Sequence, residues 1–167
     1  MLSETMAGPL ITESRVVPLL LEACPTARTA WDEHLASWKG EAAGGFNDVN
    51  VFAHHVVTSY ARGVTDECAD LFSVVERILA DGDEEARSLA ALGVLEDVQT
   101  ISTHHPFGPD AFIRWLGPLS LQAWNQIEAQ WRAGGGSLMG VVRLERAQAA
   151  RMRPKWWQFW KRNERSS

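Results

Sequence analysis

The sequence lacks the features that mark several large classes of protein. It has only two cysteines, Cys24 and Cys68, which lie far apart and form no C-x-x-C pair, so we expect neither a disulfide framework nor a cysteine-based zinc site. No stretch approaches the roughly 18 apolar residues that a transmembrane helix needs. Residues 1–10 show no basic segment followed by an apolar run, so we expect no signal peptide and a cytoplasmic protein.

Positive charge is scarce over most of the chain. The net charge of −5 divides into −11 for residues 1–136, with 8 basic and 19 acidic side chains, and +6 for residues 137–167, with 8 basic and 2 acidic ones. An acidic body repels the phosphates of nucleic acids, which argues against nucleic-acid binding by this part of the chain. The basic C-terminal region carries no such repulsion.

A period-2 strand pattern is also missing, whereas apolar residues recur at helical spacing along most of the chain. The sequence therefore predicts an all-α fold, a single bundle or a short solenoid-like array of seven to eight helices with a C-terminal helix and a Trp-rich tail. We divide it into a flexible leader (1–11), a helical domain (12–133), a glycine linker (134–136) and a basic C-terminal helix with the tail (137–167).

Four helix starts carry residues that favour the N-cap position. These are Ser14, Asn47 or Asp48, Asp83 and Ser120. The helix that begins at Asp83 is expected to run to about residue 101, with small residues on its buried side that let a neighbouring helix approach closely. Five tryptophans fit buried helix faces and are expected to pack in the core: Trp31, Trp38, Trp115, Trp124 and Trp131.

Histidines and carboxylates are the candidates for chemistry. His54 and His55 are neighbours on a predicted helix, so their side chains point about 100° apart and cannot bind one metal from one face. A metal site would need one of them beside Glu96 or Asp97 in three dimensions. The alternative is structural, with Asp97 paired to Arg114 or a helix N-terminus. We find no nucleophile and base at a telling spacing, and therefore expect a non-enzyme with no cofactor or metal.

Acidic side chains gather at two successive helix starts. One group is Asp66, Glu67 and Asp70; the other is Asp83, Glu84 and Glu85. The structural interpretation is capping and solubility. The functional interpretation is that the two helix starts pool their negative potential into a patch that steers a basic protein partner.

Three further tryptophans, Trp156, Trp157 and Trp160, lie in a short basic segment beyond the linker. Three interpretations compete. The tail folds back over an apolar groove, it lies in a membrane interface where Trp beside Lys and Arg is favoured, or it is a docking peptide for a partner.

Parts of the chain resemble known families. Residues 78–99, ILADGDEEARSLAALGVLEDVQ, resemble the turn and second helix of a HEAT-type repeat, although no second copy follows at a period of roughly 40 residues. LLLEACP, GDEEARSLAALGVLEDVQ and FIRWLGPLSLQAWNQIEAQW together resemble a family of small, helical bacterial proteins associated with immunity proteins of polymorphic toxin systems. This resemblance covers roughly residues 12–132 and supplies no site motif.

The resemblance implies a cytoplasmic protein that binds a toxin domain tightly. We therefore expect a non-enzymatic antagonist of a basic toxin domain, with the two acidic groups and the three tail tryptophans as partner-binding residues. The alternative is a membrane-associated adaptor anchored by the basic Trp-rich segment.

Overall fold

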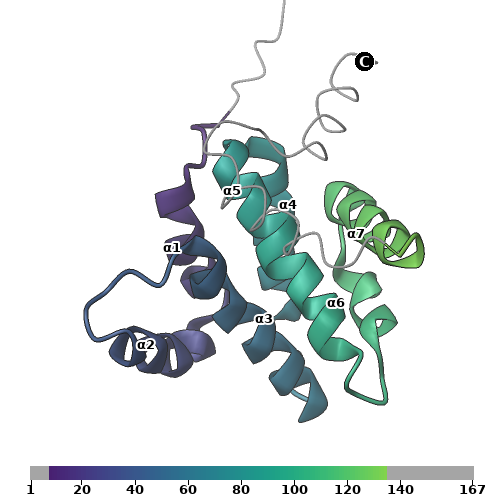
Figure 1. Cartoon of the computed structure of the whole chain (residues 1–167), viewed down its shortest axis with the longest axis horizontal. Coiled ribbons are helices and arrows are strands. Elements are labelled where there is room, and N and C mark those ends of the chain that lie inside the picture. Colours follow the sequence, from purple (N-terminus) through teal and green to yellow (C-terminus); the bar gives the residue numbers. More distant parts are fainter. Residues whose placement is uncertain (1–7, 135–167) are drawn as a thin grey trace, which may run out of the picture.

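The computed structural model describes residues 8–134, which fold into helices joined by short connections (Figure 1). This confirms the predicted all-α fold; the described part contains an isolated β-bridge between Ile11 and Gly82 but no strand. The helices are α1 (Glu13–Ala23), η1 (Pro25–Ala27), α2 (Arg28–Ser37), α3 (Gly45–Ala61), α4 (Cys68–Asp81), α5 (Glu84–Ser88), η2 (Leu89–Leu95), α6 (Glu96–Ser102), η3 (Pro109–Trp115) and α7 (Pro118–Arg132).

A continuous central helix, formed by α5, the π-helical η2 and α6, organises the core. It begins as predicted at Asp83, whose carboxylate accepts a hydrogen bond from the backbone N–H of Ala86 at 2.8 Å. Every residue of η2 is buried, because α3, α4 and α7 all pack against it. A β-carbon added at Gly93 would lie 2.3 Å from Cγ2 of Val49 on α3, so α3 approaches the central helix closely at this glycine.

Helix α2 lies at one edge of the molecule and α7 at the other, with α5 and α6 between them (Figure 1). α2 has no buried residue and packs mainly on α3 and η1. The core prediction is therefore wrong for Trp38, which follows the last residue of α2 and is 37% exposed. Of the other four tryptophans, Trp124 is buried and the remaining ones are partly buried against the core.

The predicted start of α3 is wrong by a few residues. Gly44, with a φ of 90°, precedes a helix that begins at Gly45, before both expected capping residues. Asn47 instead donates to the carbonyl of Ala43 at 2.7 Å, and Asp48 accepts from the imidazole of His34 at 2.8 Å. The sequence identified both polar side chains near this helix start, but neither one is the N-cap residue.

Helix α7 is capped from a distance. Gly117 occupies the N-cap position that we predicted for Ser120, which lies inside the first turn. The carboxylate of Glu76 on α4 accepts from the backbone N–H groups of Leu119 and Ser120, both at 2.8 Å, and from the Ser120 hydroxyl at 2.7 Å. Glu76 therefore joins α4 to α7 by satisfying donors that a helix start leaves unpaired.

Residues 8–11, which belong to the expected leader, run along the body. Ile11 is buried; its N–H donates to the carbonyl of Asp81 at 2.9 Å, and its carbonyl accepts from Asp83 at 2.8 Å. Residues 135–167, including most of the glycine linker and the whole predicted C-terminal helix and tail, lie outside the described residues. Within residues 8–134, none of the helices combines the length and hydropathy that a bilayer span requires.

Candidate functional site

The two predicted acidic groups do not form one patch. Asp66 and Glu67 precede α4, whereas Asp83 and Glu84 follow it. Because a helix of 14 residues is about 20 Å long, the groups lie at opposite ends of α4, well beyond a Debye length of about 8 Å. The prediction of pooled negative potential is therefore wrong.

Individual members of the two groups have different surroundings. Asp66 and Asp70 are exposed, whereas Glu67 is turned inward. Asp83 is the N-cap of the central helix, and of the two glutamates that follow it only Glu85 is exposed. Trp156, Trp157 and Trp160, the other predicted partner-binding residues, lie outside the part of the chain that the structure describes, and so does the segment needed for the membrane-adaptor alternative.

The predicted partners of Asp97 and of the histidines also differ from those in the structure. Asp97 accepts a hydrogen bond from the side-chain amide of Asn50 at 2.6 Å, not from Arg114, which lies over the ring of Trp115 at 4.9 Å. Glu96, rather than Asp97, is the fully buried carboxylate of this pair, with 1% exposure. His55 approaches Glu67 instead, with Nε2 at 4.0 Å from Oε2 of the carboxylate.

Four polar side chains from three segments form a hydrogen-bonded cluster. Cys24 follows α1, Thr26 lies in η1, His55 lies on α3 and Glu67 precedes α4. The Cys24 thiol donates to Oε2 of Glu67 at 2.9 Å. The Thr26 hydroxyl donates to the same oxygen at 2.5 Å and lies 2.8 Å from Nε2 of His55, while the Thr26 N–H donates to Oε1 of Glu67 at 3.2 Å.

Local sequence explains how the cluster assembles. Proline cannot continue a preceding helix without strain, so Pro25 ends α1 and turns the chain where Cys24 and Thr26 lie. Burial of Val56 and Val57 in the core fixes the rotation of α3 and leaves His55 half-buried at its rim. The cluster borders a small pocket of about 90 Å³, which Ser59, Val64, Asp66 and Cys68 also line.

The surroundings of the cluster set the protonation of its members. Burial, followed by the hydrogen bond and the negative charge of Glu67, raises the pKa of the Cys24 thiol far above its usual range. Burial also raises the pKa of Cys68, to about 11. Burial lowers the pKa of His55. For Glu67, burial acts to raise the pKa, but hydrogen bonds from Cys24 and Thr26 outweigh it and lower the pKa.

This protonation pattern restricts the chemistry. A nucleophilic cysteine needs a depressed pKa, usually from a nearby positive charge or a helix N-terminus, whereas Cys24 faces a carboxylate. Nucleophilic catalysis by Cys24 is thus disfavoured. A thiol, a neutral imidazole and an ionised carboxylate that face one another instead make a set of donors for a metal ion.

A second feature is a series of aromatic rings that leads from the core to the surface. Buried Phe52 stacks with Trp31 at a centroid distance of 6.2 Å, Trp31 contacts His34 at 5.4 Å, and His34 meets the edge of exposed Trp38 at 6.3 Å. The hydrogen bond between His34 and Asp48, at 2.8 Å, fixes the middle of this series. Trp38 is therefore held at the surface by its neighbours.

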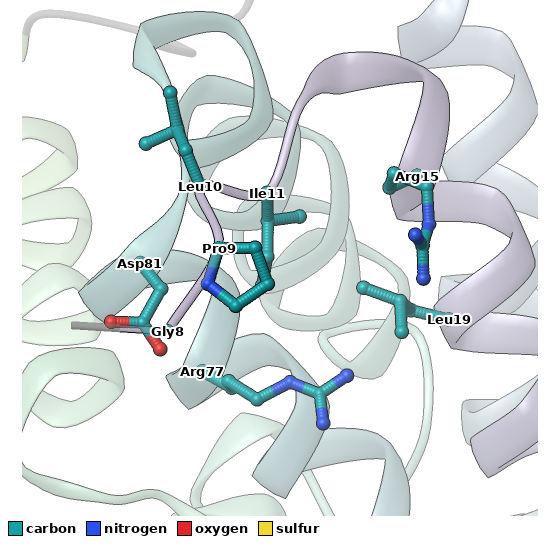
Figure 2. A pocket seen from close by; sticks show the side chains of 8 residues that line it. All are labelled: Gly8, Pro9, Leu10, Ile11, Arg15, Leu19, Arg77 and Asp81. Carbon is teal, nitrogen blue, oxygen red and sulfur yellow. The ribbon is translucent and has the colours of Figure 1, made fainter. Parts of the chain in front are cut away.

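A third feature is a shallow pocket of about 290 Å³ between the segment at residues 8–11, α1 and α4 (Figure 2). Figure 2 shows Arg15 from α1 and Arg77 from α4 at this pocket, with Asp81 at its opposite side. Among the described residues, neither guanidinium has a hydrogen-bonded or ion-paired partner. The two cations suit an anion, but the nearby carboxylate of Asp81 weakens the attraction.

The polar cluster and the arginine pocket could not be read from local sequence, because their members are far apart in the chain. Cys24 and Glu67 are separated by 43 residues, and Arg15 and Arg77 come from different helices. The one available signal was the Cys24-Pro25 helix end together with His55 off the apolar face of its helix, which located two of the donors but not their proximity.

Comparison with known proteins gives a family but no activity. No curated protein and no solved structure shows significant similarity to the chain. Residues 17–132 match a family that is described as a domain of unknown function, DUF7674. This match begins within α1 and ends at the last residue of α7, so it covers nearly the whole helical body. The chain therefore belongs to the DUF7674 family.

Proposed function

We propose that this chain is a non-enzymatic protein-binding module of the cytoplasm that captures a basic protein domain and holds it in check, as an immunity protein does with a toxin. The observation that carries the proposal is the exposed apolar pair at the C-terminal end of α2. Leu35, in the last turn of α2, is 50% exposed, and Trp38, which follows its last residue, is 37% exposed, although both are large apolar side chains.

The pair has the properties of an interface anchor. Tryptophan dominates binding energy at protein interfaces because it buries a large area at a small cost in conformational entropy. His34 and Trp31 hold Trp38 in place through the aromatic series, so little further entropy is lost when a partner covers it. Leu35 lies one helical turn before Trp38 and extends the same apolar surface.

Charge supports a basic partner. Residues 8–134 carry 18 acidic and 8 basic side chains, and the exposed acids include Asp32 and Glu33 on α2 itself. A body of this charge attracts a basic domain at long range and raises the rate of association. The two predicted acidic groups contribute to this field from separate ends of α4 rather than as one patch.

The test is direct binding to candidate partners. Basic proteins encoded beside the gene for this chain are purified, and their association with the full chain is measured by biolayer interferometry at two salt concentrations. We compare the parent with the double variant Leu35→Ser/Trp38→Ser. The control is Leu121→Ser on α7, which removes an apolar side chain that is also 37% exposed but lies at the opposite edge of the molecule.

The expected result is a complex whose dissociation constant rises at least about 30-fold in the double variant, the cost of losing one hot-spot anchor. The control variant binds like the parent, and the association rate falls with added salt. A complex that is equally tight in the parent and the double variant excludes α2 as the interface. If none of the basic candidates binds, the antagonist proposal fails.

A further inference from the structure

We propose that Cys24, His55 and Glu67 form a binding site for one zinc ion, held by a thiolate, an imidazole and a carboxylate. The three residues come from the end of α1, from α3 and from the turn before α4. The site is thus assembled only when these three segments pack together.

Distances favour a single ion between the three donors. One potential ligand atom of each residue lies within 4.8 Å of the other two. Sγ of Cys24 is 2.9 Å and Nε2 of His55 is 4.0 Å from the same oxygen, Oε2 of Glu67. Tetrahedral zinc with bonds of roughly 2.0–2.3 Å places its ligand atoms about 3.3–3.8 Å apart. Shifts of less than about 1 Å therefore convert the hydrogen-bonded cluster into a zinc site.

The donor types favour zinc over other common cations. Calcium and magnesium prefer sets of oxygen atoms, whereas one sulfur, one nitrogen and one oxygen suit the borderline-soft zinc ion. All five histidines and both cysteines of the chain lie within residues 24–105, so residues 135–167 can add no histidine or cysteine to the set.

Thr26 acts as the outer support that zinc ligands usually need. Its backbone N–H holds Oε1 of Glu67 at 3.2 Å, which leaves Oε2 directed toward Cys24 and His55. Its hydroxyl contacts Oε2 of Glu67 at 2.5 Å and Nε2 of His55 at 2.8 Å, so it holds these two ligand atoms close together in the metal-free cluster. The contact with Nε2 is given up when that atom binds zinc. With three protein ligands, the fourth position faces the adjacent pocket of about 90 Å³, which has room for a water molecule.

Binding requires one proton to leave. In zinc binding, the S–H bond of Cys24 breaks, a Zn–S bond forms and the proton passes to solvent. Glu67 is already ionised, since hydrogen bonds lower its pKa, and burial lowers the pKa of His55 and favours the neutral imidazole. Because the one hydroxyl proton of Thr26 goes to Glu67, Nε2 of His55 carries the ring proton, which moves to Nδ1 through solvent when Nε2 binds zinc. The hydrogen bond from Cys24 to Glu67 is lost, and the metal replaces it with bonds to both atoms.

The experiment uses the full chain, dialysed against a chelator and then titrated with zinc in an isothermal calorimeter. A parallel titration with cobalt records absorption, because a cobalt–thiolate bond gives a charge-transfer band in the near ultraviolet. The variants are Cys24→Ser, His55→Ala and Glu67→Gln, each checked for helix content. The control is His54→Ala, which removes the exposed neighbour of His55 and leaves the three ligands intact.

The expected result is one zinc ion per chain, a higher melting temperature with zinc, and a charge-transfer band with cobalt. Affinity falls about 100-fold or more in each ligand variant and is unchanged in His54→Ala. The band disappears in Cys24→Ser. The proposal is overturned if the folded parent does not bind one zinc ion per chain. It is also overturned if the ligand variants bind zinc as tightly as the parent, or if His54→Ala abolishes binding. This test does not involve Leu35 or Trp38, so it and the binding test can fail independently.

Discussion

Replacing Gly93 by alanine tests the close contact between α3 and the central helix. In an exposed helix, alanine is more stable than glycine by about 1 kcal/mol, so local propensity favours the change. The new β-carbon would lie 2.3 Å from Cγ2 of Val49, far inside the usual contact distance of about 3.5–4.0 Å. Val49 is fully buried and stiff at χ1, so it cannot move aside. Overpacking costs up to about 3 kcal/mol, and we expect a net destabilisation of about 2 kcal/mol.

The companion variant Val49→Ala makes the test specific. Alone, it leaves a cavity and costs about 2 kcal/mol. In the double variant the new methyl group at Gly93 occupies that cavity, so the two changes together cost about 2 kcal/mol rather than about 4. Urea unfolding followed by far-ultraviolet circular dichroism measures all four free energies of unfolding. A Gly93→Ala variant as stable as the parent, or two costs that simply add, would contradict a tight contact between Gly93 and Val49.

Three further predictions concern polar groups. Glu76→Gln removes the charged acceptor at the start of α7 and should lower the free energy of unfolding by about 2 kcal/mol in the same urea assay. The control Glu22→Gln, on the exposed side of α1, should leave this free energy unchanged. The pKa of His55 lies below its usual 6.5, so below this pH the unfolded chain binds a proton that the folded chain does not. The melting temperature should therefore fall as the pH drops below 6.5, and it should fall less steeply in the variant His55→Gln. Because Cys24 and Cys68 are buried and burial raises the pKa of both thiols, neither should react with a disulfide reagent within minutes at neutral pH. Both thiols should react at once when guanidinium unfolds the chain. Rapid reaction of the folded chain would contradict the buried, protonated state.

The candidate zinc site was only partly predictable. The sequence identified His55 as a candidate metal ligand and Glu67 as a carboxylate at a helix start, but it assigned them to different hypotheses. A carboxylate near a helix start is usually exposed, and nothing local indicates that Glu67 turns toward Cys24. The expected partners Glu96 and Asp97 were wrong because the rotation of the central helix places Asp97 against Asn50.

Local sequence by itself determined the all-α class and the start of the central helix at Asp83. These features follow from interactions between residues three or four apart, which a linear pattern records. Tertiary packing alone decided how the helices are rotated and which ones are covered. For this reason Trp38 is exposed, Glu76 caps a helix 43 residues away, and Cys24 meets Glu67, since contacts between distant segments depend on the whole arrangement and leave no local signature.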